Sequence, residues 1–296
     1  MKTKLFVADG NWYLHRCYFT INPKHREVKD ALVYSFISLI CKDAATLGCN
    51  HMLVAFDGPE IFRYKLYPQY KANRSENTEG ASIREGFKEV YYYLPYVLQT
   101  LSEVGISWVQ PRVFEADDVL CSSASYYFSS TDHVYCGTKD KDAYQYLNEH
   151  TSLYDSSFKV KGEPRPREVT YRDVPKLKGV EASQMAAYQC LIGDAIDNIP
   201  QVIHPSKAKK LIKAYGTIKS ALASQEYREE LLPCVEKLKL NAKLVTLRKD
   251  VELPELPTLR IQRKELDDDL RRFLPKSYFI LLDQASPRTR GLFARR

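Results

Sequence analysis

Carboxylates dominate the residues of this sequence that could do chemistry. They fall in five short segments, as Asp9, Asp57, Glu115 with Asp117 and Asp118, Asp140 with Asp142, and Asp194 with Asp197. Most are flanked by apolar residues, where an ionised carboxylate is costly unless a positive partner neutralises it. Sets of oxygen ligands without His or Cys suit hard cations such as Mg²⁺, with Mn²⁺ as a substitute. The pattern therefore favours a site for two divalent metal ions.

Spacing supports convergence within the segments. Glu115 and Asp118 are three residues apart, so they share a face at a helix start, and Asp194 and Asp197 share one for the same reason. Each segment alone has a simpler interpretation. First-turn acids favour a helix N-terminus, and Asp-Gly pairs such as Asp9-Gly10 are common in turns. The metal hypothesis depends on all five segments meeting.

The elements that would position these acids alternate along the chain. Short apolar strands are predicted at 4–8, 51–56, 106–110, 133–137 and 152–154, and helices at 29–47, 83–104 and 115–128. Alternating strands and helices predict an α/β fold with a central, mostly parallel sheet flanked by helices. Ligands bind beyond the carboxyl ends of such strands, and three predicted strand ends here carry Asp.

The pattern changes after about residue 180. Helices are predicted at 182–192, 206–215, 218–223 and 235–249, joined by short links. We therefore divide the chain into an α/β metal-binding core at 1–180 and a helical part with a C-terminal tail at 181–296. The stretch 159–167, rich in Pro and charge, is predicted to be a surface loop, and 287–296 a basic tail.

Positive charge is segregated from the acids. The net charge is +7, and no Asp or Glu occurs at 198–225 or at 61–74, where lysines and arginines gather. Such strips beside acidic clusters suit a site that binds both cations and a polyanion. The seven cysteines are scattered, and neither a secretory signal nor an apolar run of membrane-spanning length is present, so we expect a cytoplasmic protein without disulfides.

Six motifs, in this order, resemble those of the 5′ nucleases: VADGN, AFDG, FRYKLYPQYKANR, FEADDVL, GTKDKDAYQYL and IGDAIDNIP. This family includes bacteriophage 5′–3′ exonucleases, the 5′-nuclease domain of bacterial DNA polymerase I and flap endonucleases. The resemblance covers most of residues 4–256, and the size is most similar to a free-standing phage enzyme. It implies a helical arch at about 71–105 and a helix-hairpin-helix-like subdomain that binds duplex DNA.

The resemblance also implies roles for residues. One metal ion would be held by Asp9, Asp57, Glu115, Asp117 and Asp118, and Asp140, Asp142, Asp194 and Asp197 would surround the second. Lys71 would contact the scissile phosphate, and Tyr70 would stack on the terminal base. Arg63 and Arg74 would add phosphate contacts. We expect Lys71, Asp118 and Asp140 to be essential for cleavage.

Two features depart from the family pattern. A Gly-rich hairpin usually follows the DN of the last motif, but Ile203-His204-Pro205 stands there instead. The resemblance therefore gives no support for a monovalent-ion site, although Ser206, Lys207, Lys209 and Lys210 would still bind phosphate at a helix N-terminus. The tyrosines at 91, 92, 93 and 96 have two interpretations, helix packing or stacking on single-stranded DNA.

The predicted function is metal-dependent hydrolysis of phosphodiester bonds in flap, nicked or 5′-ended duplex DNA during replication, by a monomer without membrane association. RNA–DNA hybrids are an alternative substrate. Two other functions remain open: a non-catalytic DNA-binding protein on the same fold, and an RNase H-like enzyme.

Overall fold

The computed structural model describes residues 2–21, 29–72, 89–257, 266 and 268–285. A six-stranded sheet lies at its centre, with the strand order β3-β2-β1-β4-β5-β8. The strands are β1 (Lys4–Asp9), β2 (His51–Ala55), β3 (Ser107–Val109), β4 (His133–Gly137), β5 (Thr151–Asp155) and β8 (Arg167–Val169). All neighbours are parallel except β8, which is antiparallel to β5. The prediction of a mostly parallel sheet is confirmed.

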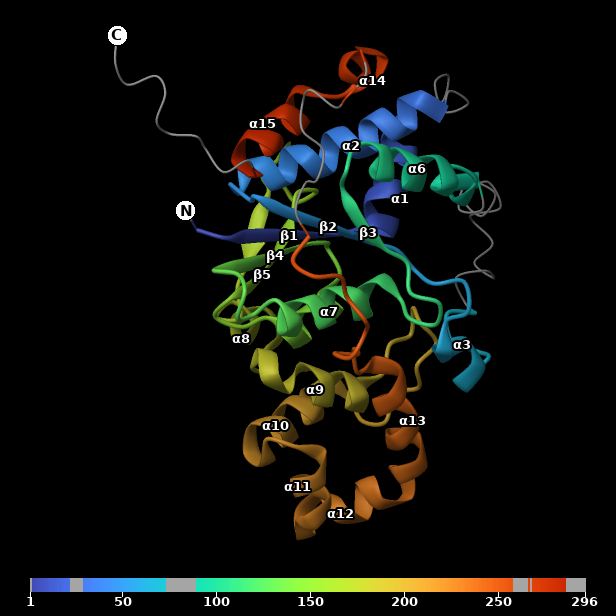
Figure 1. Cartoon of the computed structure of the whole chain (residues 1–296). Coiled ribbons are helices and arrows are strands. Elements are labelled where there is room, and N and C mark those ends of the chain that lie inside the picture. Colours follow the sequence, from blue (N-terminus) through green and yellow to red (C-terminus); the bar gives the residue numbers. More distant parts are fainter. Residues whose placement is uncertain (1, 22–28, 73–88, 258–265, 267, 286–296) are drawn as a thin grey trace.

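Helices cover both faces of this sheet (Figure 1). In the first half of the chain they are α1 (Gly10–Thr20), α2 (Lys29–Thr46), α3 (Phe62–Leu66), α6 (Leu94–Glu103), α7 (Ala116–Tyr126), the 3₁₀ helix η3 (Lys141–Tyr146) and α8 (Val174–Lys178). Helices α1, α2 and α6 lie on one face, and α7 lies on the other. Successive strand residues point to opposite faces, so Leu5 and Val7 enter one apolar cluster while Phe6 and Ala8 enter the other. This explains why the strands read as continuous apolar runs.

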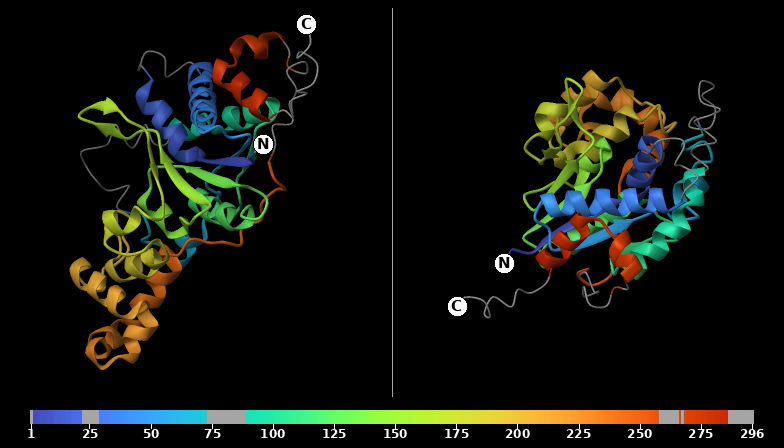
Figure 2. Two further views of the ribbon diagram at one scale, coloured as in Figure 1. Left: turned by 90° about the vertical axis from the view of Figure 1, so that its left-hand side faces the viewer. Right: turned by 90° about the horizontal axis from the view of Figure 1, so that it is seen from above.

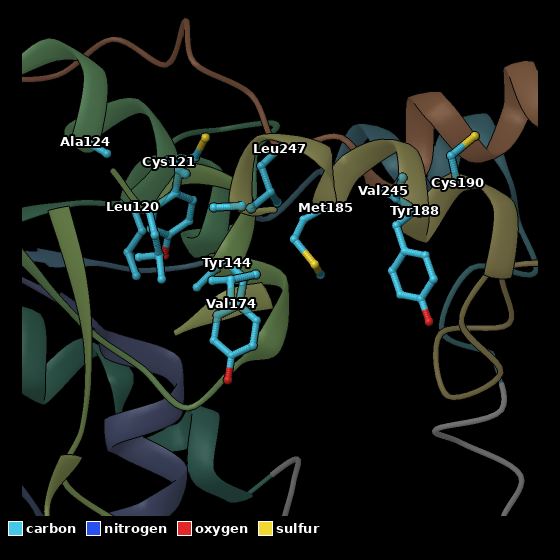
Figure 3. Close-up of a cluster of buried hydrophobic side chains, with 14 of the residues drawn as sticks. Leu120, Cys121, Ala124, Tyr144, Val174, Met185, Tyr188, Cys190, Val245 and Leu247 are labelled. Carbon is cyan, nitrogen blue, oxygen red and sulfur yellow. The ribbon is translucent and has the colours of Figure 1, made fainter. Parts of the chain in front are cut away.

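The second half of the chain forms a helical lobe beyond α7, and Figure 2 shows it projecting from the sheet. Its elements are η4 (Ala182–Gln184), α9 (Met185–Ile192), α10 (Pro205–Tyr215), α11 (Ile218–Ala223), α12 (Gln225–Leu231), η5 (Leu232–Cys234) and α13 (Val235–Val245). Figure 3 shows side chains from α7, α8 and α9 in one cluster with Val245 and Leu247. The lobe therefore shares a continuous apolar core with the sheet.

The last helices do not belong to this lobe, although they fall within the helical part expected at 181–296. Helices α14 (Asp268–Phe273) and α15 (Lys276–Ala285) return to the sheet, where α15 packs on α2. Tyr278 is fully buried there and donates a hydrogen bond to the carbonyl oxygen of Val104 over 2.6 Å. The apolar spacing of α15 could not indicate which half of the chain it would cover.

Two further predictions differ from the structure. The expected surface loop at 159–167 contains an exposed two-stranded hairpin, β6 (Lys159–Val160) and β7 (Glu163–Pro164), and ends where β8 starts. The helix expected at 83–104 is interrupted at Tyr93, and α6 begins beside it with Pro95 in its first turn, where proline is tolerated because no helical partner for its nitrogen is needed. Residues 83–88 of that helix, residues 73–88 of the predicted arch and the predicted tail at 287–296 lie outside the described residues. Within the described part of the chain, no helix is long and apolar enough to cross a membrane.

Candidate active site

Carboxylates gather at the carboxyl edge of the sheet, as the strand ends predict. A cavity of about 530 Å³ opens there. Five acids line it, together with the basic residues Arg16, Lys71 and Lys139: Asp9, Asp57, Glu115, Asp117 and Asp140. Asp9 ends β1, Asp57 follows β2 and Asp140 follows β4. Adjacent parallel strands end at one edge, so residues 131 positions apart in sequence face the same space.

Backbone groups orient these acids. Asp9 caps α1, accepting from the backbone nitrogen of Trp12 over 3.0 Å, and its other oxygen accepts from the Thr138 hydroxyl over 3.2 Å. Asp57 accepts from the backbone nitrogen of Ala116 at the start of α7, over 2.8 Å. Asp140 caps η3 by accepting from the backbone nitrogen of Asp142 over 2.9 Å. Capping places each carboxylate at a defined point on the cavity wall.

Charge accumulates in this cavity. Burial, together with the nearby charges of Asp57 and Asp140, raises the pKa of Asp9 to about 7. Burial and then Asp140 raise the pKa of Asp117 well above its ordinary value. The Oδ1 atom of Asp117 is buried and accepts no hydrogen bond from the described residues. The acids here disfavour each other's ionisation, and one carboxylate oxygen has no donor. A bound cation would satisfy that oxygen and offset the repulsion between the acids.

The donor set therefore fits hard divalent cations in chemistry and charge. The fit does not extend to preformed coordination, because no three His, Cys, Asp or Glu side chains among the described residues are arranged to hold a metal ion. The acids line the cavity from several separate elements of the fold.

Asp118 is not part of this cavity, and its expected role as a metal ligand is wrong. Its side chain is fully buried and accepts two hydrogen bonds from the guanidinium of Arg63, at 2.6 and 2.8 Å. It also accepts from the backbone nitrogen of Arg248 over 2.9 Å. Consecutive helix residues project about 100° apart, so only one of Asp117 and Asp118 can face the cavity. The structure directs Asp117 there.

Arg63 is likewise not a phosphate ligand. It is 1% exposed and, besides Asp118, donates to Glu115 over 2.9 Å and to the carbonyl oxygen of Leu244 over 2.8 Å. A guanidinium buried with its donors satisfied in this way cannot reach DNA. Its place in the basic strip had suggested exposure, because sequence does not distinguish a basic residue facing solvent from one paired inside.

Tyr70 is also buried, at 5% exposed, and packs in the apolar core. Its hydroxyl donates to Glu115 over 3.2 Å, and its ring lies 5.5 Å from that of Tyr64. The ring therefore offers almost no surface for stacking on a base, contrary to expectation.

Lys71 does lie in the cavity, where its ammonium group contacts Glu115. Its backbone has φ = +57°, in the left-handed region that costs a non-glycine residue about 1–3 kcal/mol. The backbone nitrogen of Lys71 donates to the carbonyl oxygen of Asp197 over 2.9 Å. The side-chain amide of Asn198 donates to the carbonyl oxygen of Gln69 over 3.0 Å. The loop 193–199 thus holds Lys71 in place.

The second group of acids is only partly brought together. A narrow pocket of about 30 Å³ is lined by Asp140, Asp142 and Asp197, together with Glu115 and Asp117. Burial and then the charge of Asp140 raise the pKa of Asp142 to about 7. Asp194 lies apart, in an adjoining pocket, and pairs with Lys141 over 3.2 Å. Gly193 makes this loop possible, because a Cβ there would lie 2.4 Å from the carbonyl oxygen of Ile199.

The predicted DNA-binding residues of the helical lobe lie at the start of α10, whose N-cap is His204. Ser206, Lys207 and Lys210 are exposed. Lys207 pairs with Glu230 of the same lobe, and Lys209 lies against Tyr188 with 5.9 Å between its ammonium and the ring. Arg74 lies outside the described residues.

Sequence reasoning missed several residues of the cavity. Asn11 exchanges two hydrogen bonds with Asp57, of 2.9 and 3.1 Å, and also donates to the hydroxyl of Tyr91 over 3.1 Å. Tyr91 itself lines the cavity, while Tyr92 is 65% exposed and Tyr93 is buried. The VADGN motif contained the signal for Asn11, since its last residue falls on the first turn of α1 beside Asp9.

Comparison with known proteins identifies relatives for nearly the whole chain. Residues 4–174 match the family model "5'-3' exonuclease, N-terminal resolvase-like domain", and residues 180–268 match "5'-3' exonuclease, C-terminal SAM fold". The 5'-3' exonuclease of Aquifex aeolicus is 27% identical over 277 residues, which cover 90% of this chain and 89% of the relative. DNA polymerase I of Deinococcus radiodurans is 29% identical over 263 residues, and the match spans only 26% of that longer protein.

The fold is also that of a solved nuclease. The bacteriophage T5 D15 flap endonuclease, in a pseudo-enzyme-product complex with DNA and metal ions, superposes with a TM-score of 0.68 and 22% identity over 95% of this chain and 99% of that one. At this identity the likeness establishes the architecture, a parallel sheet with a C-terminal SAM-like helical lobe.

Proposed function

The chain belongs to the 5'-3' exonuclease family, and on that premise we propose that it is a divalent-metal-dependent 5′ nuclease that cleaves flap, nicked or 5′-ended duplex DNA. The observation that carries the proposal is the acid cavity, in which Asp9, Asp117 and Asp140 converge beside Lys71. A module that only bound DNA would have no use for buried carboxylates that disfavour each other's ionisation.

The residues divide into two groups by position. Asp9, Asp57, Glu115 and Asp117 would hold one cation, and Asp140, Asp142 and Asp197 would hold the second. Asp194 would act through its contact with Lys141. Bound there, Mg²⁺ or Mn²⁺ would activate a water and neutralise charge on the attacking and leaving oxygens.

Lys71 is a cation that the chain itself supplies beside Glu115. Its ammonium lies beside Glu115 at the cavity, and its backbone is locked by Asp197. A phosphate that enters the cavity would replace Glu115 as the partner of this ammonium group. The Glu115 carboxylate would then be available to bind a metal ion. A preorganised cation at this point stabilises charge that develops on the phosphate oxygens.

The helical lobe supplies further positive charge. Lys207, Lys209 and Lys210 lie on α10, the second helix of the SAM-fold match. Contacts to the phosphate backbone would fix the duplex without reading its sequence.

One substrate panel tests the proposal. Labelled 5′ flap, nicked duplex, single-stranded and RNA–DNA hybrid substrates are incubated with Mg²⁺, with Mn²⁺ and with EDTA. We expect metal-dependent release of 5′-terminal products from flap and nicked DNA, and none in EDTA. DNA binding without cleavage under any metal would contradict the nuclease assignment, and preference for the hybrid would favour the RNase H-like alternative.

A further inference from the structure

A second pocket lies between the α/β core and the helical lobe. Its volume is about 280 Å³, and its walls come from η3, α8, α9, α10 and the loop after α9. Three lysines line it, Lys141, Lys178 and Lys209, and so do Asp142 and Asp194. These lysines come from three separate elements, so the tertiary structure alone gathers them.

The carboxylates of this pocket are already engaged. Asp194 pairs with Lys141 over 3.2 Å, and Asp142 accepts from the side-chain amide of Gln189. Within the described residues, neither Lys178 nor Lys209 forms an ion pair with a carboxylate. Two ammonium groups therefore line this pocket without a direct carboxylate partner among the described residues.

The side chain of Lys209 lies against the backbone next to Lys178. A Cβ on Gly179, the neighbour of Lys178, would lie 3.2 Å from Cδ of Lys209 and 3.5 Å from its Nζ. The two ammonium groups lie near aromatic rings, Lys178 at 5.5 Å from Tyr144 and Lys209 at 5.9 Å from Tyr188. Burial and then the charge of Lys141 lower the pKa of Lys178, and Lys209 acts weakly in the same direction, while Asp142 and Asp140 act against them. Like charges gathered in a half-buried pocket are costly unless an anion joins them.

The pocket is continuous with the acid site. Asp142, Ile199 and Val245 line both this pocket and the narrow one that contains Asp140 and Asp197. A polyanion that places one phosphate at the acid site therefore runs past these lysines. A lone phosphate fits two ammonium groups, whereas a cation is excluded by their charge.

We infer that Lys178 and Lys209 together form a binding site for one backbone phosphate of the DNA substrate, beside the acid cavity and distinct from it. This inference rests on the proposed nuclease function, since it is DNA that would bring the phosphate. The site sets how far the duplex enters the helical lobe when its scissile bond lies at Lys71.

Salt dependence of binding tests the site. Dissociation constants for a nicked duplex are measured in EDTA, where no cleavage occurs, for the wild type, Lys178→Met, Lys209→Met and the double variant. Each neutralised phosphate contributes about 0.9 to the slope of log K against log salt. Because both lysines hold the same phosphate, the double variant loses about 0.9 and not about 1.8. A double variant with the wild-type slope, or one that loses twice that amount, overturns the inference.

Matched variants separate the pocket from the general surface charge. Lys176 lies on the same helix as Lys178 but is exposed and does not line the pocket, so Lys176→Met should leave the slope unchanged. Lys178→Arg should preserve it, because the charge remains. An equal loss of slope in Lys176→Met would show that the positive charge of the whole face attracts DNA. That result would contradict a defined site. Circular dichroism of each variant establishes that it is folded.

Neutral methylphosphonates identify the phosphate. Phosphates of the substrate are replaced one at a time. At one internal position the replacement should weaken DNA binding by the wild type about tenfold, and binding by the double variant less than about twofold. If only removal of the terminal 5′-phosphate gave that pattern, the pocket would bind the strand end and the backbone assignment would be wrong. Mg²⁺-dependent cleavage by the wild type is measured in parallel, so failure of the nuclease proposal is distinguished from failure of this site.

Discussion

The guanidinium of Arg63 donates hydrogen bonds from both of its terminal nitrogens to the carboxylate of Asp118, at 2.6 and 2.8 Å. Both side chains are 1% exposed or less. The pair joins α3 to the first turn of α7 and, through the carbonyl oxygen of Leu244, to the end of α13. Arg63 also holds Glu115, whose other oxygen meets Lys71. An ion pair outside the cavity thus orients side chains inside it.

Removing one partner of this pair should strongly lower the free energy of unfolding. Asp118→Ala leaves the Arg63 guanidinium buried without its main partner, which typically costs about 3–5 kcal/mol. Urea unfolding monitored by fluorescence measures the loss. Replacing both partners, as Arg63→Met with Asp118→Leu, should recover much of it, because no unpaired charge remains. Glu60→Ala, which breaks the exposed pair with Lys65, is the control and should change stability little. A small effect of Asp118→Ala would contradict the structural role.

Loss of the Asp117 carboxylate should affect stability in the opposite way to loss of the Asp118 carboxylate. Asp117→Asn removes a buried carboxylate whose pKa is raised, so the metal-free protein should be at least as stable at pH 8. Its cleavage should fall more than about 100-fold, since even residues that only support metal ligands cost about 10–100-fold. Single-turnover cleavage and thermal unfolding are measured on the same preparations. An active Asp117→Asn enzyme would remove this residue from the metal site.

The stability of the metal-free protein should decrease as pH rises. The pKa values of Asp9 and Asp142 are raised from 3.8 to about 7, chiefly by burial. Between these values the folded protein holds protons that the unfolded chain has released, so each group loses about 1.4 kcal/mol of stabilising free energy per pH unit. The contribution is complete below pH 3.8 and absent above about pH 7.

The measurement is the melting temperature in EDTA from pH 5 to 8. His51 and His133, whose pKa values are lowered by burial, act in the opposite direction, so the comparison is with Asp9→Asn, which retains both histidines. That variant should lose less stability than the wild type over this range. Mg²⁺ should stabilise the wild type more at pH 8 than at pH 5.5, because it replaces the lost protons. Identical pH profiles for the two proteins would contradict the raised pKa of Asp9.

Lys71→Ala should slow the chemical step without removing the metals. Loss of one preorganised group that stabilises transition-state charge typically costs about 10²–10³-fold in rate. Single-turnover cleavage measures the rate, and the Mg²⁺-induced rise in melting temperature reports metal binding, which should persist. Lys65→Ala is the matched control, since Lys65 is exposed and pairs with Glu60. Unchanged single-turnover cleavage in Lys71→Ala would exclude this lysine from the reaction.

The sequence by itself determined the sheet and the edge at which the site lies. Apolar runs of strand length, each followed by Asp, require a parallel sheet when helices separate them, and parallel strands place Asp9, Asp57 and Asp140 at one edge. These are local patterns, with the strand and its terminal acid adjacent in the chain. The helices predicted at 29–47 and 218–223 follow from local pattern as well and match α2 and α11.

Only the tertiary structure decided which neighbouring residue serves which role. Asp117 and Asp118 have the same chemistry, and the packing of α7 between the sheet and the end of α13 directs one to the cavity and the other to Arg63. The basic strip could not reveal that Arg63 is buried, and nothing local relates Lys178 to Lys209. Burial and pairing depend on contacts between segments far apart in the chain, and these contacts form only when the chain folds.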